Sequence, residues 1–251
     1  MAAGLKGTVA LVTGASSGIG EATARELAAR GAAVALAARR ADRLTALAAQ
    51  ISAAGGTALV VEADLMEQDQ AREAVDQTVQ AYGRLDILIN NAGFARRGPI
   101  VDGSVADWER MVRLNVLGSL YCAHAALPHL LRAAEDEPRE VADLVNVSSL
   151  SGRIVRKGSG VYNATKHAMN AYSESLRQEV AGRRVRVSLL EPAAVATELF
   201  PPEVRRRHVE DHGAYERLTS DDVADAVGYI VTRPRHVAVS ELLVRPTEQE
   251  R

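Results

Sequence analysis

The sequence has little of what marks several specialised classes of protein. Its 251 residues include one cysteine, Cys122, so no disulfide can form within the chain, and a cytoplasmic location is expected. No apolar run approaches the roughly 18 residues of a membrane-spanning helix, and the opening residues 1–6 are too short and polar for a signal peptide. The formal net charge of -2 argues against a nucleic-acid partner. An ordinary globular composition remains.

Short apolar and β-branched runs alternate along the chain with longer stretches of helical period. Strands are expected at residues 8–13, 33–38, 57–62, 85–90, 141–147, 185–191 and 238–244. Helices are expected at residues 21–30, 43–54, 67–82, 105–131, 161–180 and 221–231. This alternation predicts an α/β fold: a Rossmann-type, doubly wound parallel sheet of about seven strands with helices on both faces.

We expect a single domain over residues 1–251, with a cofactor half at about 1–140 and a catalytic half at about 141–251. Ligands of such sheets bind beyond the carboxyl ends of the strands. The charged stretch 135–140 is expected to be solvated surface. Residues 198–219 are expected to form a substrate loop that acts as a lid. Within them, the arginines 205–207 are a solvated helix face or, less favoured, a contact for an anionic substrate.

A glycine-rich loop joins the first expected strand to the first expected helix. It reads Thr13-Gly14-Ala15-Ser16-Ser17-Gly18-Ile19-Gly20, with the spacing G-x-x-x-G-x-G. Glycines let a backbone approach a pyrophosphate, which is held by the free N–H groups of the helix N-terminus. A glycine cluster can be only a tight turn, but one placed between a strand and a helix favours a dinucleotide cofactor.

The end of the second expected strand favours NADP(H) over NAD. An acidic residue there would bind the ribose hydroxyls of NAD, whereas this chain has Ala38 followed by Arg39 and Arg40. Guanidinium groups pair with phosphate, so they suit the 2′-phosphate of NADP. The alternative is a solvated start of a helix. Asp64, after the third strand, is either an acceptor for the adenine amino group or a helix cap.

Tyr162 and Lys166 are the candidates for acid–base chemistry. Only three lysines occur in the chain, and one lies four residues after Tyr162 on an expected helix, so both side chains share one face. A nearby positive charge is expected to lower the tyrosine pKa toward the working pH, as a proton donor to an alkoxide requires.

Ser149 and Asn115 complete the candidate catalytic residues. Ser149 ends an expected strand, where its hydroxyl can donate to a substrate oxygen; the alternative is a serine-rich turn. Asn115 lies within an expected helix, where asparagine is disfavoured. It is either simply exposed, or it holds a water or bends the helix.

In this order the residues resemble the classical short-chain dehydrogenase/reductase family over nearly the whole chain. The family's glycine motif matches the loop above, its N-N-A-G matches residues 90–93, and its catalytic tetrad matches Asn115, Ser149, Tyr162 and Lys166. The resemblance implies hydride transfer between C4 of the nicotinamide and a small carbonyl or alcohol substrate. It also implies that Lys166 holds the nicotinamide ribose, that Asn115 supports a water leading to solvent, and that the protein is a homotetramer.

Motifs and resemblance together define the expected site. The expected cofactor-binding residues are Gly14, Ser16, Ser17, Gly18, Ile19, Gly20, Arg39, Arg40, Asp64, Leu65, Asn91, Ala92, Gly93, Tyr162, Lys166, Pro192, Val195 and Thr197. Candidates for the substrate pocket are Phe94, Leu150, Ser151, Leu199, Phe200 and Tyr215. No metal site is expected. The segments 37–40 and 243–247 resemble the branch of bacterial NADP-dependent 3-hydroxy acid dehydrogenases and clavulanic aldehyde reductase.

One position departs from the family pattern. After the sixth strand the family has P-G-x-V-x-T, whereas this chain has Ala193 after Pro192. Alanine adds a methyl group near the nicotinamide and is unfavourable where φ is positive, which puts the pocket shape in doubt.

Two other functions use the same motifs. A sensor or scaffold that binds NADP without turnover would be expected to lack Tyr162 or Lys166, and both are present. An isomerase or dehydratase of this fold tends to have a substrate domain, which this chain lacks.

Overall fold

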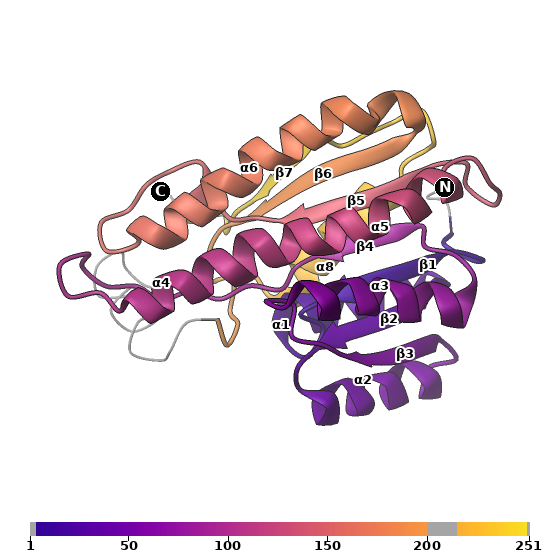
Figure 1. Ribbon diagram of the computed structural model, residues 1–251, viewed down its shortest axis with the longest axis horizontal. Coiled ribbons are helices and arrows are strands. Elements are labelled where there is room, and N and C mark those ends of the chain that lie inside the picture. Colours follow the sequence, from indigo (N-terminus) through magenta and orange to yellow (C-terminus); the bar gives the residue numbers. More distant parts are fainter. Residues whose placement is uncertain (1–3, 200–214, 250–251) are drawn as a thin grey trace.

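The computed structural model describes residues 4–199 and 215–249 and confirms the expected parallel sheet (Figure 1). Its strands are β1 (Val9–Thr13), β2 (Ala33–Ala38), β3 (Thr57–Glu62), β4 (Ile87–Asn90), β5 (Ala142–Val147), β6 (Val185–Pro192) and β7 (Glu241–Val244). They form one seven-stranded sheet in the order β3-β2-β1-β4-β5-β6-β7, with parallel pairing throughout. The order reverses between β1 and β4, and such a switch point is where these sheets bind ligands.

Helices cover both faces of the sheet. They are α1 (Gly18–Ala29), α2 (Ala41–Ala53), α3 (Gln68–Tyr82), α4 (Val105–Val112), α5 (Ser119–Ala133), α6 (Gly160–Val180) and α8 (Ser220–Val231). Alternate residues of β1 point to opposite faces: Ala10 and Val12 pack toward α1, α2 and α8, whereas Val9 and Leu11 pack toward α3, α5 and α6. Burial on both faces explains why the strand is a continuous apolar run.

The helix expected at residues 105–131 is wrong in one respect, because it is not continuous. A π-helical turn, Arg113–Gly118, separates α4 from α5. The side chain of Asn115 accepts a hydrogen bond from Phe94 N at 2.7 Å and donates one to Phe94 O at 2.9 Å. At Gly118 an added Cβ would lie 2.7 Å from the carbonyl oxygen of Leu65. The π-helical turn therefore packs closely against the two loops that follow β3 and β4.

Two expected boundaries are wrong by a few residues. The first helix begins at Gly18 and not at residue 21, so the last glycines of the loop form its first turn. The last strand begins at Glu241 and not at residue 238. Propensity favoured the later start for the helix because glycine is a poor helix former.

A buried ion cluster fastens the amino ends of β5 and β6 to the end of α8. Asp143 is fully buried and accepts hydrogen bonds from Arg186 at 2.7 and 2.9 Å and from Arg139 at 2.8 Å. Arg186 also donates to the carbonyl oxygens of Val231, at 3.1 Å, and Val237, at 2.7 Å. The expectation that residues 135–140 are solvated surface is therefore wrong for Arg139, whose side chain pairs with a buried carboxylate.

Candidate functional site

A long open groove, with about 1670 Å³ of empty space, follows the carboxyl ends of β1 to β4 and collects most of the expected cofactor residues. Those that line it are Gly14, Ser16, Ser17, Gly18, Ile19, Arg39, Arg40, Asp64, Leu65, Asn91, Ala92, Gly93, Tyr162, Lys166 and Thr197. Pro192 and Val195 line the adjoining cavity. Gly20 lies behind the loop, against Gly14.

The glycine loop is packed too closely for side chains at two of its positions. Gly14 has a φ of +67°, and a Cβ there would lie 2.9 Å from the Cα of Ala92. A Cβ on Gly20 would lie 2.4 Å from the carbonyl oxygen of Gly14. Asn91 joins the two motifs, since its side-chain amide donates to Thr13 O at 2.9 Å. The loop therefore leaves its backbone open to a ligand along the groove.

Arg40 lies directly on the glycine loop. Its Nε donates to Ser16 Oγ at 3.0 Å, and its Nη2 donates to Ser17 Oγ at 2.7 Å. Arg43, one turn along α2, was not predicted as a site residue. It lies near Arg40, because both guanidinium groups pair with the Glu198 carboxylate: Arg43 at 3.0 Å and Arg40 at 3.4 Å. The spacing of three residues on a helix was the signal that could have identified it. Two guanidinium groups and two hydroxyls thus form a set of donors suited to a phosphate.

Asp64 lies at the other side of the groove from the glycine loop. Its Oδ1 accepts from the backbone N–H of Met66 at 3.1 Å, and its Oδ2 lies 3.8 Å from Arg39 Nη1. The N-cap of α3 is Glu67, so Asp64 caps the turn before the helix and not the helix itself. Its carboxylate still lines the groove, which leaves the expected adenine contact as a prediction.

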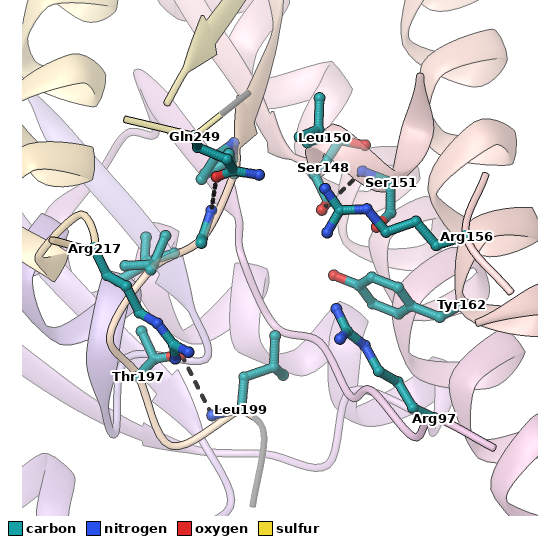
Figure 2. Close-up of a pocket in the computed structure, with 16 residues that line it drawn as sticks. Arg97, Ser148, Leu150, Ser151, Arg156, Tyr162, Thr197, Leu199, Arg217 and Gln249 are labelled. Carbon is teal, nitrogen blue, oxygen red and sulfur yellow. Dashed lines mark hydrogen bonds between the residues drawn. The ribbon is translucent and has the colours of Figure 1, made fainter. Parts of the chain in front are cut away.

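Tyr162, Lys166 and Ser149 lie together, as predicted, at the boundary between the groove and a second cavity. Tyr162 and Ser149 both line this cavity, and the Ser149 hydroxyl acts on the pKa of the Tyr162 phenol. Lys166 Nζ donates to Val147 O at 3.0 Å and lies 5.8 Å from the centre of the Tyr162 ring. Tyr162 lines both spaces, and Figure 2 shows its hydroxyl pointing into the cavity. A group bound in the cavity would therefore meet the phenol beside the groove.

The predicted direction of the Tyr162 pKa is wrong for this structure. Burial raises the pKa of Tyr162 above its ordinary value; the hydrogen bond from Ser149 and the charge of Arg97 lower it, but by less. Burial also lowers the pKa of Lys166 to about 8, so its positive charge is itself disfavoured. Tyr162 is consequently protonated at neutral pH.

The depressed pKa of Lys166 predicts a pH-dependent stability. Its folded-state pKa of about 8 lies below the ordinary 10.5, so between these values the unfolded chain holds a proton that the folded protein has released. Stability contributed by this group therefore rises with pH across that window and is constant below it. We expect the free energy of unfolding of the wild type to rise by about 3 kcal/mol relative to Lys166→Met over this range.

Urea denaturation of the two proteins at several pH values measures this difference. Lys157→Met, which removes an exposed lysine, should follow the wild-type curve. Parallel curves for wild type and Lys166→Met would contradict the assigned pKa.

Asn115 braces the loop after β4 against α6. Besides its two bonds to Phe94, it donates to Thr165 Oγ1 at 3.2 Å, next to Lys166. It is buried and lies in the widened turn, so the exposed alternative is wrong and the helix irregularity is confirmed. The water that the family resemblance implies stays a prediction.

The second cavity lies beside Tyr162 and is the candidate substrate pocket (Figure 2). Of the expected pocket residues, Leu150, Ser151 and Leu199 line it, whereas Phe94 lines the cofactor groove. Tyr215 lies close enough to Arg97 for its charge to act on that residue, and Phe200 lies outside the described residues, as do Arg205 to Arg207. The sequence analysis missed four residues that line the cavity: Arg97, Arg156, Arg217 and Gln249.

Ala193, where the family has glycine, is accommodated without strain. Positive φ among the described non-glycine residues occurs only at Glu140 and Arg184. Ala193 N–H donates to Val244 O at 2.9 Å, and the neighbouring Ala194 N–H donates to Gln249 Oε1 at 3.2 Å. The end of the described chain therefore holds this loop in place at the edge of the cavity.

Three further observations concern the rest of the molecule. Across residues 4–199 and 215–249, no group of three or more histidine, cysteine, aspartate or glutamate side chains is arranged to hold a metal ion. Within the same ranges, every helix is too short or too polar to cross a lipid bilayer. Burial in α5 raises the pKa of the Cys122 thiol to about 12, so it is not a nucleophile at neutral pH.

Comparisons with known proteins identify the family of this chain. The family model of the short chain dehydrogenases matches residues 8–207. An uncharacterised oxidoreductase of Staphylococcus aureus (strain MRSA252) is 37% identical over 241 residues, covering 95% of this chain and 96% of the relative.

Solved structures show the same fold. A short chain dehydrogenase from Burkholderia cenocepacia J2315, in complex with NADP, has a TM-score of 0.85 at 31% identity, covering 96% of this chain and 97% of that one. An alcohol dehydrogenase from the archaeon Thermococcus sibiricus, complexed with 5-hydroxy-NADP, has a TM-score of 0.85 at 27% identity, covering 97% and 98%. Because these matches extend from the glycine loop past α6, the chain is an oxidoreductase of the classical short-chain dehydrogenase/reductase family.

Proposed function

We propose that the protein is an NADP(H)-dependent oxidoreductase that interconverts a carbonyl and an alcohol, with Tyr162 as general acid and base. The observation that carries this proposal is the position of Tyr162 and Ser149, which line one cavity, with Tyr162 also lining the groove at its boundary. A carbonyl oxygen placed against both hydroxyls would receive a hydrogen bond from Ser149 and a proton from Tyr162. The raised pKa of Tyr162 keeps the proton available for reduction.

The groove fits an NADP dinucleotide, which supplies or accepts the hydride when bound. Residues Gly14 and Ser16 to Ile19 of the glycine loop line the groove at the start of α1, where the free N–H groups of a helix N-terminus would bind a pyrophosphate. Arg40, with Ser16 and Ser17, would hold the 2′-phosphate. Lys166, buried between Tyr162 and the end of β5, would hold the nicotinamide ribose. The Burkholderia and Thermococcus structures, which contain NADP and 5-hydroxy-NADP, support this choice of cofactor.

Calorimetry with NADPH and NADH, followed by NADPH oxidation with a panel of aldehydes and ketones, tests the proposal. We expect tighter binding of NADPH and reduction of at least one carbonyl class. If neither cofactor binds, the interpretation of the glycine loop fails and the proposal fails with it. Tight NADPH binding without turnover of any carbonyl would favour a non-catalytic NADP-binding protein. Cytoplasmic location and a tetrameric assembly remain predictions for fractionation and light scattering.

Arg40→Gln is expected to reduce NADPH affinity by about 10- to 100-fold and to leave NADH affinity nearly unchanged, because hydrogen bonds to a charged phosphate are stronger than neutral ones. Calorimetry with both cofactors measures the change. Arg72→Gln is the matched control, since it removes an exposed arginine of α3 that pairs with Asp69 and Asp76. Equal losses of affinity for NADPH and NADH would show that Arg40 supports the glycine loop and does not bind the 2′-phosphate.

A further inference from the structure

The cavity beside Tyr162 is strongly positive. Three arginines from three separate segments line it: Arg97 after β4, Arg156 before α6, and Arg217 before α8. Among the described residues that line this cavity there is no aspartate or glutamate. The remaining described lining is made of uncharged side chains: hydroxyl and apolar groups and the amide of Gln249.

Two of the three guanidinium groups flank the reacting position. Figure 2 shows Arg97 and Arg156 on either side of the Tyr162 hydroxyl, with Arg217 across the cavity on the opposite wall, beside Thr197. Their charges act on one another: burial lowers the pKa of Arg97, and the charges of Arg156 and Arg217 lower it further. Bringing like charges together in a partly buried space costs free energy that a bound anion would offset.

Arg156, which lines this cavity, has an unsatisfied hydrogen-bond donor. Its Nη2 is buried and makes no hydrogen bond to any group among the residues that the structure describes. Arginines are common in this chain, and most make surface ion pairs such as Arg183 with Glu135, in which both side chains are more than half exposed. Arg156 differs from them, because an unsatisfied buried donor is unfavourable unless a ligand completes it.

We propose that the substrate carries a carboxylate close to its reacting carbonyl, and that Arg156 and Arg97 bind this group while Arg217 approaches it from the far wall. The proposal rests on the function proposed above. A guanidinium matches the two oxygens of a carboxylate, and both arginines lie beside the hydroxyl that would receive the carbonyl oxygen. The anion must therefore lie only a few bonds from the carbonyl carbon, as it does in a short oxo acid and the hydroxy acid formed by its reduction.

Matched pairs of oxo acids and their methyl esters test this proposal, because each pair differs only in charge. Acetoacetate and levulinate, each with its methyl ester, are suitable. We expect the wild type to reduce the acid with a kcat/KM about 10- to 100-fold above that of the ester, from the strength of charged hydrogen bonds. Arg156→Gln should remove most of this preference, mainly through KM of the acid. Arg183→Gln, which removes an exposed arginine just before β6, at the amino ends of the strands, should preserve it.

A binding measurement keeps this test independent of turnover. Butyrate and butyramide, which lack the reacting carbonyl, are titrated into the NADP⁺-loaded wild type and into Arg156→Gln. Tighter binding of butyrate to the wild type, reduced in Arg156→Gln, supports the proposal even if no oxo acid is reduced, in which case only the proposed reaction fails. Esters reduced as well as acids, an equal loss for acid and ester in Arg156→Gln, or butyrate binding no tighter than butyramide would overturn it.

Discussion

Tyr162→Phe is expected to lower kcat for carbonyl reduction by about 10²- to 10⁴-fold, the range that general acid–base catalysis contributes. The variant removes only the hydroxyl, which points into the cavity. The ring itself is 5% exposed and packs with Ala95 and Met111, so phenylalanine should fill the same space. NADPH affinity should change little, because the groove keeps the glycine loop and Arg40. Steady-state turnover and calorimetry on the same preparation separate the two effects.

Tyr172→Phe is the matched control for this experiment. Tyr172 is a half-buried tyrosine on the same helix, α6, and lines neither the groove nor the cavity among the described residues. Its loss should leave kcat near the wild-type value. Retention of more than about a tenth of the activity in Tyr162→Phe would assign the proton transfer to another group.

Asp143→Ala is expected to reduce the free energy of unfolding by about 3–5 kcal/mol, the cost of breaking a buried ion pair from one side. The substitution leaves Arg186 and Arg139, with side chains 6% and 8% exposed, without the carboxylate that both bind. Urea denaturation measures the loss. Because the cluster lies at the amino ends of the strands, the folded fraction should still bind NADPH.

Glu135→Ala is the control for the ion cluster. It breaks the pair with Arg183, in which the two side chains are 60% and 58% exposed, and such pairs contribute at most about 1 kcal/mol. A similar small loss for Asp143→Ala would mean that water or other groups satisfy Arg186 once the carboxylate is gone.

The sheet was predictable because burial dictates its sequence. The strand β1 is buried at each position on both faces, and so it appears in the sequence as an unbroken apolar run between turn signals. The interruption of the helix at residues 113–118 was not predictable, since it depends on Phe94 and Leu65, which contact the turn only after folding. Arg139 was misjudged for a similar reason: Asp143 stands out as a carboxylate within a buried strand, but its pairing with Arg139 is visible only in the folded chain.

The candidate site divides in the same way. The glycine loop, Ser149, Tyr162 and Lys166 follow local rules of spacing, and the structure places them together. Arg97, Arg156 and Arg217 come from three loops, and no local pattern distinguishes them from the many other arginines. The direction of the Tyr162 pKa was missed because charge was considered without burial, and burial is the larger effect here.

Glu198 occupies Arg40 and Arg43 with an internal carboxylate. A dinucleotide phosphate bound to Arg40 would compete with that carboxylate, which lies 3.4 Å from Nη1, so loss of this ion pair offsets part of the electrostatic gain. Each exposed ion pair is worth at most about 1 kcal/mol. This competition couples phosphate binding at Arg40 to the position of Glu198. By thermodynamic reciprocity, whatever holds Glu198 on α2 weakens phosphate binding, and phosphate binding releases Glu198 by the same free energy.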